Sequence, residues 1–150
     1  MFYPVKAQQV GDIVAGAVGG TVKNCYVLAM GMALEVGWGY NTIGRLMAKA
    51  ITEINFIVRN FANKKDLLII NDYVVADFLS TSLSPHSKNR SAGQAISKGR
   101  AKAISEGTAS IASLVKRLGD KKIKKLPLLQ AINKIVNNKK NINSLLEVIK

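Results

Sequence analysis

Acid–base chemistry has few candidate residues in this chain. His86 is the only histidine, and it lies in a serine-rich stretch beside Lys88 and Arg90. A nuclease could use a histidine next to cationic groups to cleave a phosphodiester bond. A single histidine in a polar stretch is more often a surface residue, so a nuclease-type toxin ranks last of three candidate functions.

Metal ions and cofactors have no binding motif in the sequence. One cysteine, Cys25, and one histidine cannot complete a zinc site, and the nine acidic residues are scattered. The glycines at Gly16, Gly19 and Gly20 lack the Gly-Lys-Ser/Thr ending of a phosphate-binding loop, and strands do not alternate with helices as in a dinucleotide-binding fold. We therefore expect no catalytic residues, no metal site, no cofactor and no enzymatic activity.

Positive charge is the clearest chemical feature of the sequence. The 22 Lys and Arg residues against 9 Asp and Glu give a net charge of +13. Such residues neutralise nucleic-acid phosphates without reading bases, and the lack of aromatic residues after Phe78 favours duplex over single-stranded nucleic acid. We predict that the following residues bind nucleic acid: Lys88, Arg90, Lys98, Arg100, Lys102, Lys116, Arg117, Lys121, Lys122, Lys124 and Lys125.

The elements that must position these cations are helical by their residue patterns. We predict an all-α fold, an irregular bundle of about five to six helices with basic amphipathic helices in its C-terminal half. Apolar residues recur at helical spacing over 41–61 and 127–137, and a last short helix follows Asn141 or Asn143. One basic helix is expected from 90 to 118, capped by Ser87 or Asn89 and stopped at Gly119. Residues 66–79 favour a helix, with two short strands as the alternative.

The N-terminal half is apolar and rich in glycine. Residues 10–40 predict a buried helical hairpin that turns near 19–24, because Asp12, Lys23 and Glu35 interrupt a membrane span. Small residues at helical spacing let helices approach closely. We therefore predict that the chain self-associates, as a homo-oligomer, through the following glycines: Gly16, Gly19, Gly20 and Gly31.

Domain organisation follows from the same asymmetry. At 150 residues the chain is expected to form a single helical domain. It divides at most into an apolar self-association half over 1–79, a linker over 80–90 and a basic half over 91–150. The N-terminus does not resemble a signal peptide, so we expect the protein inside a cell, a virion or another assembly.

These features favour a non-enzymatic structural protein. Its apolar half would self-assemble and its basic half would coat or compact nucleic acid, as in a virion coat or nucleoid protein. The alternative is a membrane-active protein, a pore-former or toxin domain, that inserts the glycine-rich hairpin while the lysine-rich helices lie on anionic lipid. Nucleic acid, a second copy of the chain and an anionic membrane are thus the expected partners.

Overall fold

The structure is a computed structural model, and it describes residues 13–62, 72–100 and 103–150. Within these ranges the chain forms helices and no strand, so the predicted all-α fold is confirmed. Seven helices follow in the described residues, slightly more than expected: α1 (Ile13–Glu35), α2 (Tyr40–Ala62), α3 (Asp72–Leu83), α4 (Lys88–Ser97), α5 (Glu106–Ile123), α6 (Pro127–Val136) and α7 (Ser144–Ile149).

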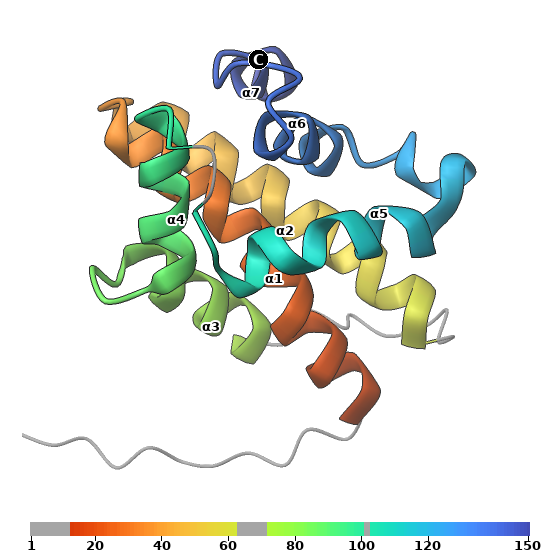
Figure 1. Cartoon of the computed structure of the whole chain (residues 1–150). Helices are drawn as coiled ribbons and strands as arrows, with labels where there is room; N and C mark the ends of the chain where they lie inside the picture. Colours follow the sequence, from red (N-terminus) through yellow and green to blue (C-terminus); the bar gives the residue numbers. More distant parts are fainter. Residues whose placement is uncertain (1–12, 63–71, 101–102) are drawn as a thin grey trace, which may run out of the picture.

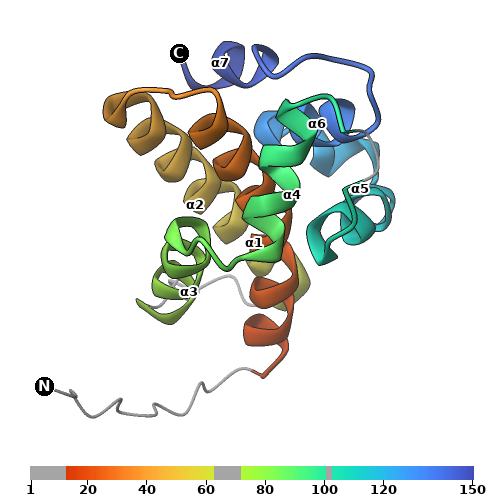
Figure 2. The same cartoon turned by 60° about the vertical axis from the view of Figure 1, so that its left-hand side comes forward.

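Helix α1 is the centre of the molecule. Helices α2, α3, α4, α5 and α6 all pack against it, and Figures 1 and 2 show it running through the middle of the other helices. The sequence explains this position. Of the nine residues from Cys25 to Ala33, the eight other than Gly31 carry apolar or aromatic side chains or a thiol, and each is at most 1% exposed. A helix that is apolar on all sides is stable only when other elements cover all of its sides.

The predicted hairpin over 10–40 is wrong. Residues 13–35 form one uninterrupted helix, and the chain turns instead after Glu35, at Gly37, whose φ is +72°. The N–H of Trp38 donates to the carbonyl of Ala33, and the N–H of Gly37 donates to that of Leu34. This is the hydrogen-bond pattern of a helix that ends on a left-handed glycine. Gly19 and Gly20 have no positive φ and remain within the helix.

Helix α2 confirms the helix predicted over 41–61, extended by one residue at each end. Its apolar stripe faces the core, and the charged residue Glu53 is buried with it. The Glu53 side chain is 2% exposed. Its two carboxylate oxygens accept hydrogen bonds from the N–H groups of Leu128 and Leu129 at the start of α6, and from the hydroxyl of Tyr26. Glu53 thereby joins α1, α2 and α6 inside the core.

The predicted basic helix over 90–118 is also wrong, because the chain breaks between α4 and α5. Gly99 takes a left-handed conformation, with φ of +77°, directly after the end of α4. Helix α5 then starts anew at Ser105, whose side chain and that of Thr108 form a capping box. These stop and start signals override the continuous apolar periodicity. The expected cap at Ser87 is confirmed. Gly119 takes a left-handed conformation, with φ of +71°, and interrupts α5 there, but helical turns resume after it and run to Ile123.

The remaining elements agree with the sequence patterns over the residues described. Residues 72–79 are helical in α3, while 66–71 lie outside the described residues. Pro127 opens α6, and α7 begins after Asn143. The segment 80–90 contains the end of α3, a short turn and the start of α4. The division of the chain into two halves and a linker stays a prediction.

Candidate active site

Lys23 is a cationic residue on an otherwise apolar helix, and two side chains of α3 hold it. Its Nζ atom lies 2.5 Å from Oδ1 of Asp77 and 2.9 Å from Oγ1 of Thr81. Asp77 and Thr81 are four residues apart, so they share one face of α3. The Lys23 side chain is only 12% exposed. The ammonium group is therefore fixed in place at the boundary between core and solvent.

The next residue, Asn24, connects α1 to the start of α5. Its amide nitrogen donates to Oε2 of Glu106 over 2.7 Å. The N–H of Gly107 donates in turn to Oδ1 of Asn89 on α4, over 2.8 Å. A β-carbon on Gly107 would lie 2.4 Å from the carbonyl oxygen of Asn24. The backbones of α1 and α5 thus touch here, and polar side chains of α1, α4 and α5 meet around Asn24, the residue after Lys23.

Two cationic residues of the first turn of α4 adjoin this polar cluster. Lys88 is exposed, and Arg90 is half-buried with its Nη1 donating to the carbonyl of Leu83 at the end of α3. The Nε atom of Arg90 and the hydroxyl of Ser82 are buried, and neither has a hydrogen-bond partner among the described residues. Positive charge and a helix N-terminus together suit an anionic ligand.

Among the described residues, the other predicted cations form no hydrogen bond or ion pair with this cluster. Lys98 pairs with Glu35 over 2.9 Å, Arg100 is exposed, and Lys102 lies outside the described residues. Lys125 lies over the ring of Phe56, 5.8 Å from its centroid. The rest are exposed on α5 or in the turn after it: Lys116, Arg117, Lys121, Lys122 and Lys124.

Two of the four glycines predicted to mediate self-association pack against other helices of the same chain. A β-carbon on Gly31 would lie 2.1 Å from a backbone carbonyl of α4, so this glycine lets α1 and α4 cross in direct contact. Gly19 faces Val74 of α3 at an ordinary packing distance. Gly20 has open space around it, and Gly16 lies one turn earlier on α1.

The sequence analysis missed the members of the polar cluster as functional residues. Lys23 was noted only as an interruption of an apolar run, and Asp77, Asn24 and Glu106 were not singled out. The available signal was the cost of placing Lys23 and Asn24 on a helix whose neighbouring residues are buried, because a buried polar group needs a partner. The partners themselves lie 54 and 82 residues away in the chain, respectively.

Other kinds of site are not formed by the described residues. Within them, no three His, Cys, Asp or Glu side chains gather as ligands for a metal ion. Nor does any described helix have the length and apolar character needed to cross a membrane. His86 is exposed in the turn before α4, and its backbone N–H donates to the hydroxyl of Ser84.

The described residues thus form a helical bundle with a polar cluster where its helices meet. Comparison with known families shows which family the chain belongs to. Residues 12–147 match the family described as the C-terminus of NAD-dependent glycerol-3-phosphate dehydrogenase, and the chain belongs to this family.

Similar proteins carry the same description. The chain is 30% identical over 133 residues to glycerol-3-phosphate dehydrogenase [NAD(P)+] of Agathobacter rectalis, across 83% of this chain and 39% of the relative. It is 29% identical over 133 residues to that of Pelotomaculum thermopropionicum, across 83% and 38%. For Mycobacterium leprae the values are 36% over 89 residues, across 59% and 25%. The chain therefore spans at most about two fifths of these relatives.

Family membership corrects the functional predictions made from the sequence. A structural protein that coats nucleic acid is wrong, as are the membrane-active and nuclease alternatives, because the family is a dehydrogenase family. The expectation of a non-enzymatic protein is wrong for the same reason. The predicted nucleic-acid and membrane partners are wrong, because the family is a dehydrogenase family. Self-association with a second copy stays a prediction. Net positive charge alone does not distinguish a partner that is a polymer from one that is a small anion.

The family name implies NAD, but the described residues do not form the fold that usually binds a dinucleotide. They form helices and no parallel sheet, and no glycine-rich turn among them leads from a strand into a helix. We therefore assign no contact of this chain to the dinucleotide.

Proposed function

We propose that this chain forms the substrate-binding part of an NAD-dependent glycerol-3-phosphate dehydrogenase, with Lys23 at the reacting hydroxyl. The observation that carries the proposal is the fixed position of the Lys23 ammonium between Asp77 and Thr81. Family membership supports it, because the relatives are named for this reaction. Bound NAD supplies the hydride acceptor of such a reaction.

Lys23 can serve the proton part of the reaction. An alcohol that is oxidised loses its hydroxyl proton, and a carbonyl that is reduced gains one, so an enzyme needs a positioned proton carrier. Two hydrogen bonds, to Asp77 and Thr81, occupy two of the three donors on Nζ and leave the third for the substrate oxygen. In oxidation the neutral amine accepts the proton, and in reduction the ammonium returns it.

The substrate phosphate fits the cations at the start of α4. Lys88 and Arg90 lie in the first turn of this helix, whose N–H groups and dipole also favour an anion. Asn89, between them, is buried and bonded to Gly107, so the turn is anchored to α5 beside Asn24. The cations that the sequence suggested for nucleic-acid phosphates would thus bind the phosphate of a small ester.

Calorimetric titration of glycerol 3-phosphate into the chain tests this proposal. Lys23→Met should weaken binding at least tenfold. Lys98→Met is the matched control, because Lys98 also pairs with a carboxylate but at the opposite end of α4. The affinity of this variant for glycerol 3-phosphate should stay within twofold of wild type. Glycerol should bind far more weakly than its phosphate. Equal affinities of wild type and Lys23→Met would refute the role of Lys23.

A further inference from the structure

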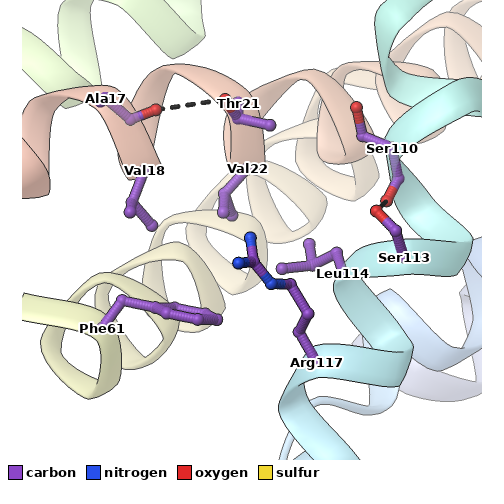
Figure 3. A pocket seen from close by; sticks show the side chains of 9 residues that line it. All are labelled: Ala17, Val18, Thr21, Val22, Phe61, Ser110, Ser113, Leu114 and Arg117. Carbon is purple, nitrogen blue, oxygen red and sulfur yellow. Dashed lines mark hydrogen bonds between the residues drawn. The ribbon is translucent and has the colours of Figure 1, made fainter.

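A cavity lies between α1, the end of α2 and α5. It is separate from the polar residues around Lys23 and Asn24, which we call the Lys23 cluster. Its volume is about 310 Å³, at the lower end of the range of roughly 300–1,000 Å³ typical of small-molecule sites. Apolar side chains of three helices form its floor (Figure 3): Val18, Val22, Phe61 and Leu114.

Arg117 adds a positive charge to the lining of this cavity. Its side chain extends from α5 over the apolar floor, with the guanidinium near Val22 and Leu114 (Figure 3). None of the described residues forms an ion pair or hydrogen bond with this guanidinium. The hydroxyls of Thr21 and Ser113 donate within their own helices, to the carbonyls of Ala17 and Ser110. The guanidinium is therefore the strong donor available to a ligand.

From this arrangement we infer a binding site for a small carboxylate with a short, unbranched apolar tail. The carboxylate would form a two-pronged, charge-assisted pair with Arg117, and the tail would cover the apolar floor. The apolar floor suits a hydrocarbon tail better than the hydroxyl groups of glycerol 3-phosphate, which lose hydration against apolar side chains. The site thus differs in chemistry from the proposed substrate site.

The cavity is placed to influence the Lys23 cluster. Thr21 and Val22 directly precede Lys23 on α1, and Ser110 lies one turn after Glu106 on α5. A ligand here would bridge the two helices that the Asn24–Glu106 hydrogen bond joins. We assign the site to an effector, and this regulatory role, unlike the binding itself, rests on the proposed function.

Calorimetry with sodium octanoate and the whole chain tests the site. Octanoate should bind at least tenfold more tightly than octanol, and octylamine should bind no better than octanol, since only the carboxylate can pair with Arg117. Arg117→Gln should reduce octanoate binding to the level of octanol. Lys116→Gln removes the same charge from the adjacent exposed residue, which does not line the cavity, and should change the affinity less than twofold.

Two results would overturn the inference. One is octanoate binding no tighter than octanol in the wild type. The other is an equal effect of Arg117→Gln and Lys116→Gln, which would indicate only general attraction to a basic surface. Thermal melts of both variants check that the fold is retained. Because octanoate is titrated without glycerol 3-phosphate, failure here leaves the Lys23 experiment unaffected, and the two proposals can fail separately.

Discussion

Gly31 of α1 and Gly93 of α4 face each other where their helices cross. The Cα of Gly31 lies 3.1 Å from the position that a β-carbon on Gly93 would take, and that β-carbon would be 2.1 Å from the carbonyl oxygen of Leu28. Such a distance is far inside van der Waals contact, so neither position accepts even a methyl group without movement of a backbone. The crossing places Asn89 and Arg90 of α4 beside the Lys23 cluster.

Alanine at either crossing glycine should therefore destabilise the protein strongly. For Gly31→Ala and Gly93→Ala we expect a loss of about 3 kcal/mol or more in the free energy of unfolding, at the upper end of overpacking effects. Gly20→Ala and Gly44→Ala are the controls, because nothing lies within 4 Å of their β-carbons. These should be neutral or stabilising by up to about 1 kcal/mol. Urea unfolding measures all four, and equal effects at Gly31 and Gly20 would contradict the packing described.

Glu53 should make stability depend on pH. Burial raises the pKa of this carboxyl above its ordinary value of 4.5, although hydrogen bonds from Leu128, Leu129 and Tyr26 and the charge of Lys49 oppose the shift. The folded state therefore holds the proton to higher pH than the unfolded chain does. As pH rises from about 4.5 through the folded-state pKa, the contribution of this group to stability falls.

A substitution that cannot titrate isolates this effect. In Glu53→Gln the amide keeps the shape of the side chain but carries no charge at any pH. We expect the stability difference, wild type minus variant, to decrease as pH rises from 4.5 to 7.5 in a series of urea titrations. A difference that increases with pH would mean that the folded-state pKa is lowered instead.

The thiol of Cys25 should be inert in the folded protein. It is fully buried, and burial raises the pKa of the thiol to about 12. Since the thiolate is the reactive form, a disulfide reagent at pH 8 should leave Cys25 unmodified for as long as the chain stays folded, and should modify it within minutes in denaturant. Rapid reaction of the native protein would show that the packing of α1 against α5 opens readily.

The sequence was sufficient to predict the elements whose signals are local. The apolar stripe of α2, Pro127 at the start of α6 and the left-handed Gly119 each depend on neighbouring residues alone. The single helix α1 was mistaken for a hairpin because its glycines look like turn residues until the backbone of α4 is placed against Gly31. This requirement comes from packing against another helix, so no sequence pattern within residues 13–35 reveals it.

The candidate site was harder to predict from the sequence, because its residues also meet only through tertiary packing. Lys23 meets Asp77 and Thr81 only because α3 packs on α1, and Asn24 meets Glu106 only because α5 does. None of these pairs has a characteristic spacing in the chain. The charge excess singled out Lys88 and Arg90, which flank Asn89 of the cluster, but net charge cannot distinguish a polymer from a small ester as the partner.

The most direct test of the proposed substrate site is to map glycerol 3-phosphate onto the chain by nuclear magnetic resonance. Titration into protein labelled with ¹⁵N should shift the backbone amide signals at the cluster, namely those of Lys23, Asn24, Thr81, Asn89 and Gly107. A second cationic hollow, lined in part by Arg45, Lys49 and Lys150, lies between α2 and α7 and serves as an internal control. Shifts centred on Lys23 and saturating together would support the account. Shifts confined to the Arg45 hollow, or none at millimolar ligand, would contradict it.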